Sequence, residues 1–164
     1  MSSHPAWLPP LVLLQDHGKD KEAYLNAVYA FFRLDFVESS PSFQGVRLAL
    51  KRHPLRDGKE ATFWHLTTEG SDEFSRTLDI DRCERIRWPR PIIERDQAIK
   101  CWRNSRKNNE PRICLWLEDA EYLVVLAERR GYILLWTAYP VREKHRKDKL
   151  EKEFQAYKKA NAAP

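Results

Sequence analysis

Residues 112–141, RICLWLEDAEYLVVLAERRGYILLWTAYPV, decide the fold of this chain. Three apolar runs of strand length, 113–117, 122–127 and 132–139, are separated only by two polar segments of four residues each. Connections this short join antiparallel neighbours but cannot contain a parallel crossover, so the stretch predicts an antiparallel β-meander. The runs are apolar at odd and even positions alike, which indicates a sheet covered on both faces.

The end of the third run changes character. Under strict alternation, Ile133 and Leu135 share a face with Thr137 and Tyr139, so two hydroxyl groups end an otherwise apolar face. Pro140 then removes a backbone donor and ends the strand. The hydroxyl pair is either ordinary strand composition, because both residue types favour strands, or the edge of an active site.

Length and composition narrow the class of protein. A chain of 164 residues is the size of one domain, so we expect an N-terminal lead over 1–19 and a single α+β domain over 20–164. The net charge of +5 favours polyanionic partners. Three cysteines without a CxxC pair fit a reducing compartment, and we expect a cytoplasmic protein. The histidines lack metal-binding spacing and the apolar segment Trp7–Leu14 is too short to span a bilayer, so we expect no metal, no cofactor and no membrane partner.

Outside the meander, apolar spacing predicts three helices and a hairpin. A helix is expected over residues 21 to about 37. Alternation over 46–50, a turn signal and a second apolar run over 61–68 predict a β-hairpin. Further helices are expected over 91 to about 105 and, strongly basic, over 142–159. The fold class is therefore α+β: an N-terminal helix, a β-hairpin, a middle helix, an antiparallel β-meander and a basic C-terminal helix.

The second run of the hairpin contains a candidate catalytic residue. His65, in FWHLTTEG, is the one histidine inside a predicted strand. Imidazole changes charge near neutral pH, so a histidine held in a framework is a candidate general base or acid. The alternative is a structural histidine. Lys59, just before the run, is most simply a solvated turn lysine.

Two basic segments are candidates for binding phosphate. In CERIRWPRPII, residues 83–93, Arg85, Arg87 and Arg90 are interleaved with apolar residues. Guanidinium groups beside aromatic rings suit phosphate binding and base stacking, although a solvated basic face is an equal alternative. The basic helix follows directly on Tyr139, so a phosphate held at the strand end would lie near cations such as His145 and Arg146.

Four of these stretches together, FWHLTTEG, ERIRWPRPIIE, ICLWLEDAEYLVVL and YILLWTAYPV followed by a basic helix, resemble the phage-associated branch of the barnase/EndoU/colicin/RelE group of endoribonucleases. The resemblance implies helices followed by a four-stranded antiparallel sheet, and a toxin or phage-derived effector that cleaves RNA without a metal and has a possible cognate inhibitor protein. By motif position it implies a catalytic set, which is His65, Arg87, Thr137 and Tyr139. Lys59, Arg85 and Arg90 are implied as further RNA-binding residues.

These observations predict a metal-independent endoribonuclease. The 2′-hydroxyl of RNA is its own nucleophile, so the enzyme needs a base, an acid and cations, and the product is a 2′,3′-cyclic phosphate. His65 would act as base or acid, Arg87 would hold the phosphate, and Thr137 with Tyr139 would bind phosphate oxygens or transfer a proton. The alternative is a non-catalytic nucleic-acid-binding or protein-interaction module of the same fold. A structural protein would instead need a large exposed apolar patch.

Overall fold

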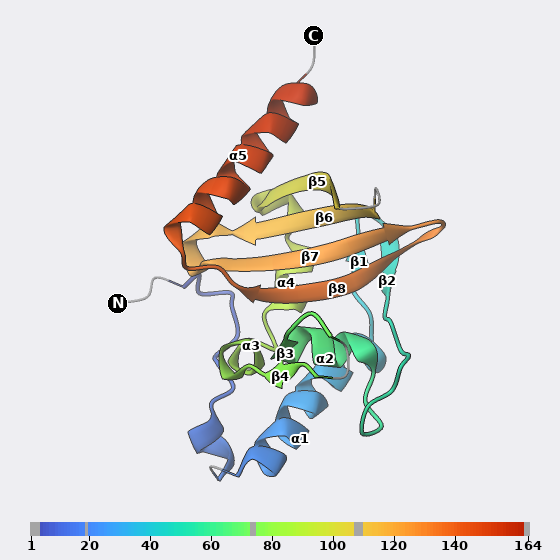
Figure 1. Ribbon diagram of the computed structural model, residues 1–164, viewed down its shortest axis with the longest axis vertical. Helices are drawn as coiled ribbons and strands as arrows, with labels where there is room; N and C mark the ends of the chain where they lie inside the picture. The colour runs from blue at the N-terminus through green and yellow to red at the C-terminus, as the bar shows by residue number, and fades with distance from the viewer. Residues whose placement is uncertain (1–3, 19, 73–74, 107–109, 163–164) are drawn as a thin grey trace.

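A computed structural model describes residues 4–18, 20–72, 75–106 and 110–162, and a six-stranded β-sheet lies at its centre (Figure 1). The strands are β1 (Ser42–Phe43), β2 (Val46–Ala49), β5 (Lys100–Arg106), β6 (Glu110–Leu117), β7 (Tyr122–Arg129) and β8 (Tyr132–Pro140). Their order is β1-β2-β8-β7-β6-β5, and every neighbouring pair is antiparallel except β2 with β8, which is parallel. The predicted meander is therefore confirmed, and β5 extends it to four strands.

Helices cover the two faces of this sheet unequally. The helices are α1 (Lys21–Phe32), α2 (Ala61–Thr67), α3 (Ile80–Glu84), α4 (Pro89–Glu94) and α5 (Lys144–Ala160), with single turns at η1 (Leu14–His17), η3 (Asp96–Ala98) and η5 (Glu118–Ala120). A π-helical turn, η2 (Arg33–Val37), continues α1, so the predicted first helix has its expected extent. The first four α-helices pack on one face, and α5 lies on the other and runs past β5 (Figure 1). No helix in the described part of the chain is both long and apolar enough to cross a membrane.

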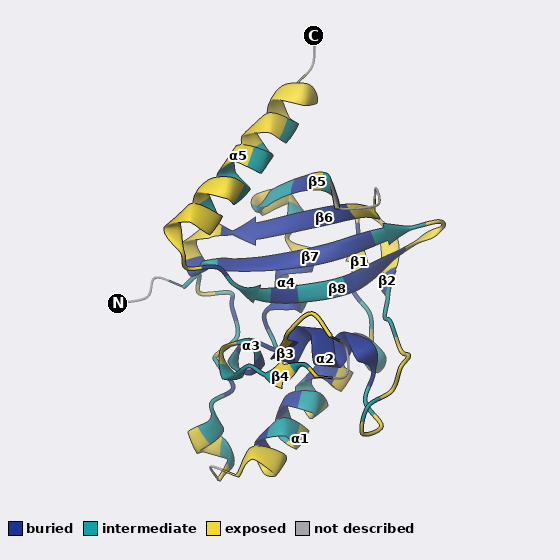
Figure 2. Ribbon diagram, in the orientation of Figure 1, coloured by how far each residue is buried: buried dark blue, intermediate teal, exposed yellow. Residues whose placement is uncertain are grey.

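The α+β class is confirmed, and both faces of the meander are covered as predicted. Residues 122–127 of β7 are all buried (Figure 2). Val124 and Leu126 belong to the large core against the first four helices, which we call the body core. Leu123 and Val125 belong to a smaller core under α5, which we call the α5 core. Alternation along β7 therefore supplies both cores from one strand.

The predicted hairpin strand over residues 61–68 is wrong, because residues 61–67 form helix α2. The segment is buried on every side, so it shows no polar face from which its period could be determined. Its threonines are tolerated in a helix because their hydroxyls bond to the preceding turn: Thr67 Oγ1 donates to Phe63 O at 2.9 Å, and Thr68 Oγ1 donates to Trp64 O. β2 pairs instead with β1 and β8.

The predicted middle helix over 91–105 is wrong beyond its first turns. α4 begins at Pro89 and ends at Glu94, and the turn η3 and strand β5 follow it. Ile99 and Cys101 face the body core while Trp102 faces the α5 core, so the segment has the two-residue period of a strand. The C-terminal helix, in contrast, lies within one or two residues of its predicted bounds.

The N-terminal lead runs along the body as an extended strap. Val12 N donates to Glu84 O at 2.9 Å, and Trp88 Nε1 donates to Pro9 O at 2.9 Å. Residues 1–3 and 19 of the lead lie outside the described residues. The strap therefore joins the end of α3 and the segment that follows it to the N-terminal part of the chain.

A β-bulge near the end of β8 changes which side chains face which core. Val125 of β7 pairs with Thr137 and Leu126 pairs with Leu135, so Trp136 is an extra residue without a partner in β7. Leu135 and Ala138 pack in the body core, whereas Trp136 and Tyr139 pack against the α5 core. Strict alternation is therefore wrong here, and Tyr139 does not share a face with Leu135.

Candidate functional site

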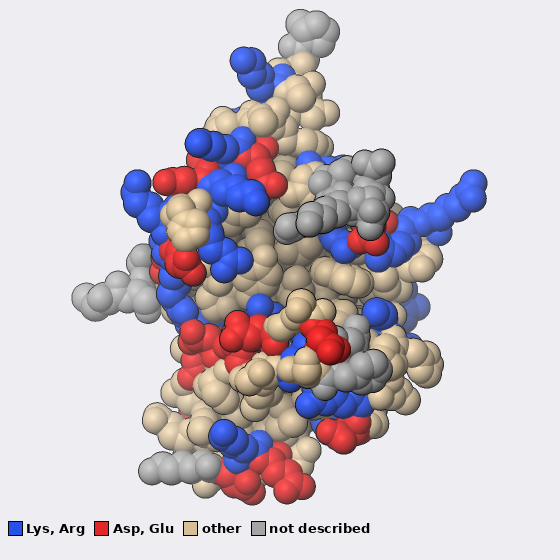
Figure 3. Space-filling model, viewed as in Figure 1, with Lys and Arg blue, Asp and Glu red and all other residues tan. Residues whose placement is uncertain are grey.

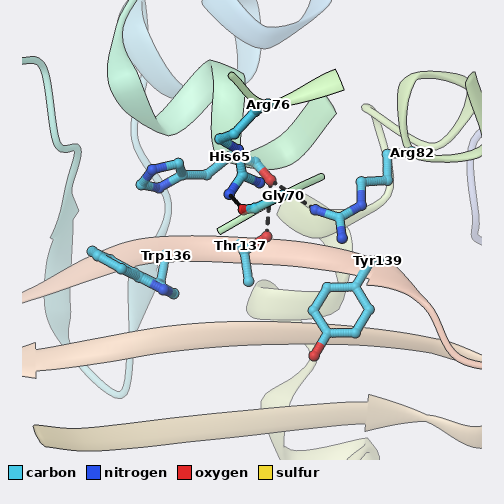
Figure 4. A pocket seen from close by; sticks show the side chains of 7 residues that line it. All are labelled: His65, Gly70, Arg76, Arg82, Trp136, Thr137 and Tyr139. Carbon is cyan, nitrogen blue, oxygen red and sulfur yellow. Dashed lines mark hydrogen bonds between the residues drawn. The ribbon is translucent and has the colours of Figure 1, made fainter. Parts of the chain in front are cut away.

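The C-terminal end of α2 and the end of β8 enclose a pocket of about 200 Å³ (Figure 4). We call it the His65 pocket, and its lining residues are His65, Gly70, Arg76, Arg82, Trp136, Thr137 and Tyr139. The lining comes from α2, α3, β8 and the hairpin of β3 (Thr68–Glu69) with β4 (Thr77–Leu78). Segments distant in sequence therefore meet at one opening in the surface.

A hydrogen bond fixes α2 to β8 at the centre of the pocket. Thr137 Oγ1 donates to the backbone carbonyl of His65 at 2.9 Å, across a separation of 72 residues. Arg82 Nη1 donates to the same carbonyl at 3.2 Å and to Thr68 O at 2.7 Å. Carbonyl groups at a helix C-terminus lack partners within the helix, and these two side chains supply them.

Two guanidinium groups bring positive charge to the pocket. Arg76 donates to Thr68 Oγ1, Thr68 O and Gly70 O at 2.6–2.8 Å, and the carbonyls that bind Arg76 and Arg82 hold both groups in place. A carboxylate, Asp79, lies 3.5 Å from Arg82 Nε. Cations are favoured at the C-terminal end of a helix, where α2 ends. Gly70 has φ of 131°, and a Cβ there would come within 3.3 Å of Arg76 Cα, so this close approach requires glycine.

The imidazole of His65 lies to one side of the pocket. Its ring centroid is 5.1 Å from that of Trp136, with a tilt of 57°, and the residue as a whole is only 6% exposed. In Figure 4 the imidazole and the ring of Tyr139 lie on opposite sides of Thr137, with Arg76 and Arg82 on the α2 side. His65 thus meets Thr137 through its carbonyl, while its ring is held at the Trp136 end.

Cations also lie around the ring of Trp136. Arg112 lies 4.4 Å from the ring centroid, and Lys51 and Arg129 each lie 5.7 Å from it. The negative face of an aromatic ring attracts such groups. Cationic groups therefore pack around Trp136 at the bulge of β8, and one of them, Arg112, is buried and paired with Glu110 at 2.8 Å.

Tyr139 joins the His65 pocket to two further depressions, each of about 290 Å³. The first, which we call the Arg142 pocket, is lined by Glu69, Asp79, Asp81, Arg82, Tyr139, Pro140, Arg142 and Arg146. The second, which we call the α5 cavity, is lined by Leu123, Tyr139, Val141, His145, Arg146, Lys149, Leu150 and Glu153. The ring of Tyr139 lies 5.0 Å from the guanidinium of Arg82 and 5.8 Å from that of Arg146. Because Tyr139 lines all three, they lie next to one another around its ring, and we call the three together the Tyr139 groove.

An ion pair bridges the middle of this groove. Arg142 Nη1 donates to Asp81 Oδ2 at 2.8 Å, and this hydrogen bond lowers the pKa of the Asp81 carboxyl below its usual range. The positive charge of Arg142 is thereby matched, whereas the guanidinium of Arg146 makes no ion pair among the described residues.

Several residues proposed from the sequence lie together in this groove. His65, Thr137 and Tyr139 line the His65 pocket, and His145 and Arg146 line the α5 cavity. This convergence is what the sequence predicted for the hydroxyl pair and the histidine, although the histidine comes from a helix.

Arg87 and Arg85 lie elsewhere. The guanidinium of Arg87 packs 4.8 Å from the ring centroid of Phe31 and does not line the groove. Arg85 is 8% exposed and lies 3.6 Å from Asp81 and 3.5 Å from Glu84. Both arginines therefore act in packing and ion pairs of the body.

Arg90 and Lys59 also make their contacts on the body side of the sheet. Arg90 donates to Glu94, to Ser39 Oγ and to the carbonyl of Asp35, at 2.6–2.7 Å, and so fastens α4 to the end of η2. Lys59 Nζ lies 5.2 Å from the ring centroid of Tyr29. Neither lines the groove.

Sequence reasoning missed Arg76 and Arg82. The signal for Arg82 was Asp79, whose side chain accepts from Arg82 N at 3.2 Å and caps α3. A capped helix starting at Ile80 would have separated Arg82 from the arginines that follow it. Arg76 lies in a polar loop without periodicity, two residues of which, 73 and 74, lie outside the described residues.

Within the described residues, no cluster of three or more His, Cys, Asp or Glu side chains is arranged to hold a metal ion. Comparison with known proteins gave no match to a family model, to a curated protein or to a solved structure. The chemistry of the groove is therefore interpreted from its own side chains.

Proposed function

We propose that this protein is a metal-independent endoribonuclease that cleaves RNA by attack of the 2′-hydroxyl, leaving a 2′,3′-cyclic phosphate. The observation that carries the proposal is the convergence of His65, Tyr139, Arg76 and Arg82 on one pocket. The reaction needs a base, an acid and cations for the charge that develops on phosphorus, and this pocket offers candidates for each.

Arg76 and Arg82 take the role that the sequence gave to Arg87. Their guanidinium groups are fixed by carbonyls of the α2 end, so they would meet an incoming phosphate without reorganisation. Arg82 also contacts the ring of Tyr139, which keeps the cation and the aromatic ring together.

His65 and Tyr139 act as the proton-transferring pair. The imidazole takes the proton of the 2′-hydroxyl, the oxygen forms a bond to phosphorus, and the leaving 5′-oxygen takes a proton from the phenol of Tyr139. Thr137 is a positioning residue, because its hydroxyl already donates to the carbonyl of His65.

RNA is the partner that the groove suits best. Trp136 and Tyr139 offer aromatic rings beside cations, and a single strand binds by base stacking and by contacts between cations and phosphates. Helices against an antiparallel meander support a barnase/RelE-like arrangement, and thus a toxin or phage-derived effector with a cognate inhibitor. Three free cysteines support a cytoplasmic location.

One observation favours a second candidate, a non-catalytic RNA-binding module. The imidazole packs on Trp136 in a residue that is 6% exposed, which is the environment of a structural histidine. The same cations and aromatic rings would then bind RNA without cleaving it.

Cleavage of labelled RNA in EDTA separates the two candidates. We expect a 2′,3′-cyclic phosphate product, and a loss of rate of about a hundredfold or more in both Tyr139→Phe and His65→Ala, because each removes a proton-transferring group. Tyr132→Phe is the matched control, since Tyr132 lies in the same strand, is 46% exposed and does not line the groove.

Folding is measured alongside by thermal melting. Tyr139→Phe is expected to keep the wild-type melting temperature. Its cleavage rate therefore distinguishes the nuclease from the binding module even if His65→Ala unfolds. If wild-type protein forms no cyclic phosphate product but binds RNA with a strong salt dependence, the protein is the binding module instead.

A further inference from the structure

The α5 cavity has the composition of a nucleotide site. Its floor is apolar and comes from both the sheet and the helix: Leu123 and Val141 are buried, and Leu150 is half-buried. Its rim carries His145, Arg146 and Lys149, the first turns of α5, together with Tyr139 and Glu153. An apolar surface suits a base, and a cationic rim suits a phosphate.

The cations on this rim differ from other cations of the same helix. Lys144 lies 3.5 Å from Asp148, and Lys147 pairs with Glu121. Within the described residues, neither Arg146 nor Lys149 has a hydrogen bond or ion pair to a carboxylate. Two cations of α5 outside the cavity are thus paired with carboxylates, whereas Arg146 and Lys149 on the rim are not, in the part of the chain that the structure describes.

The one carboxylate on the rim is engaged elsewhere. Glu153 Oε1 accepts from Asn104 Nδ2 at 2.9 Å, which directs this side chain toward β5. His145 lies 3.4 Å from Glu143, and both side chains are exposed. Figure 3 shows many Lys and Arg side chains over α5, interspersed with Asp and Glu side chains, above an acidic band. The rim is therefore positive.

The cavity also adjoins the candidate active site. Arg146 lines both the α5 cavity and the Arg142 pocket, and Tyr139 lines these two and the His65 pocket. At about 290 Å³, the cavity is close to the lower limit of ordinary ligand pockets, about 300 Å³, which suits one nucleotide better than a longer segment.

We propose that the α5 cavity is a second nucleotide subsite, which takes the nucleotide that follows the one in the His65 pocket. The base rests on Leu123, Val141 and Leu150, and the phosphate lies between Arg146 and Lys149. The ligand is then single-stranded RNA of at least two nucleotides that passes over Tyr139. The order of the two nucleotides rests on the proposed function; the binding does not, because it requires no cleavage.

Charge reversal of one rim lysine tests the subsite against a matched position. Lys149→Glu changes the rim, whereas Lys152→Glu makes the same change of net charge at an exposed residue of α5 that does not line the cavity. The probe is a 2′-O-methyl tetranucleotide, which has no free 2′-hydroxyl and is not cleaved. We expect Lys149→Glu to weaken binding, measured by fluorescence anisotropy, about tenfold and Lys152→Glu to weaken it less than about twofold. Equal effects of the two substitutions would overturn the proposal.

Amide chemical shifts locate the bound nucleotide directly. With a 2′-O-methyl dinucleotide as probe, we expect shifts at Leu123, Val141 and Leu150 of ¹⁵N-labelled protein, because the base contacts the floor. Inorganic phosphate at the same concentration is the control. Shifts of the same size with phosphate alone would reduce the site to an anion site and overturn the nucleotide assignment.

The subsite and the nuclease can fail separately. If wild-type protein cleaves RNA and Lys149→Glu leaves the KM unchanged, the subsite is wrong and the nuclease stands. If wild-type protein never cleaves RNA but Lys149→Glu weakens the binding of the tetranucleotide about tenfold, the nuclease proposal is wrong and the subsite proposal stands.

Discussion

The two faces of the central sheet are closed to different degrees. On the body side, α1 buries Tyr24, Val28 and Phe32 completely in the body core, where the ring of Phe32 lies 5.4 Å from that of Phe63 of α2. On the other side, α5 has no buried residue and contributes Leu150, Phe154 and Tyr157, all half-buried (Figure 2). Because stability follows apolar burial, the body side holds the fold together and the α5 side leaves surface for binding.

The candidate site lies where these two layers meet. α2, from the body, supplies His65, and α5, from the open side, supplies Arg146. β8 connects them, because its bulge at Trp136 turns Tyr139 from the body core to the α5 core. A bulge at the end of a strand re-aims side chains, and here it puts the aromatic side chain of Tyr139 beside pockets of both layers.

Truncation of one leucine in each layer gives the largest expected difference. Leu135→Ala, in the body core, is expected to destabilise the fold by about 3 kcal/mol, because a fully buried leucine leaves a cavity. Leu150→Ala, in α5, is expected to cost about 1 kcal/mol, because half of that side chain is already in contact with water and alanine favours a helix. Urea unfolding measures both values.

Equal costs for the two leucines would contradict the comparison, since they would mean that α5 is packed as firmly as the body. Leu150→Met is the conservative control, because it keeps volume and helix preference and should cost much less than the alanine.

The meander and the long helices could be predicted because their patterns are unambiguous. Three apolar runs with short connections allow one arrangement, and α1 and α5 have caps or stripes of helical period. The structure of residues 61–67 could not be predicted in this way. Every one of these side chains is buried, so the alternation in the sequence does not separate a buried face from an exposed one. Tertiary contacts overrode the strand preference of its aromatic and β-branched residues.

The site could be predicted in part for the same reason. His65, Thr137 and Tyr139 stood out as polar groups in apolar runs, and they lie together. Arg87 and Arg82 are five positions apart, yet only the capped turn of α3 directs Arg82 into the groove. The bulge could not be predicted either, because one extra residue in β8 does not change the composition of the strand.

The cysteines offer a second, smaller contrast between the layers. Cys83 lies in the body core and Cys114 in the α5 core, and both are buried. Burial raises the pKa of the Cys83 thiol to about 12, so Cys83 reacts only when its surroundings open. Local opening is easier where fewer apolar contacts must break, so we expect Cys114 to be labelled faster by a thiol reagent, by about tenfold or more.

Single-cysteine variants, with the other two cysteines changed to alanine, make the measurement specific. The ratio of native to denatured labelling rates gives the free energy of opening at each site. Identical opening energies equal to the free energy of global unfolding would show that α5 does not detach on its own.

The smallest expected effect concerns the ion pair between the layers, Asp81 with Arg142. The hydrogen bond from Arg142 lowers the pKa of Asp81 in the folded state, so the contribution is present above the unfolded value, about 3.9, and is lost as pH falls through the lower folded value. Both side chains are about half exposed, so solvent screening limits the cost of Asp81→Asn to about 0.5 kcal/mol at neutral pH. Urea midpoints of wild type and Asp81→Asn should therefore differ at pH 7 and converge in acid. Asp148→Asn removes the same charge from a pair within α5 and should show a smaller difference, because that pair joins no layers.

The opposite outcome would be a destabilisation by Asp81→Asn that stays the same after the carboxyl of the wild type is protonated. In that case the Asp81 side chain would join the two layers by packing and not by its charge.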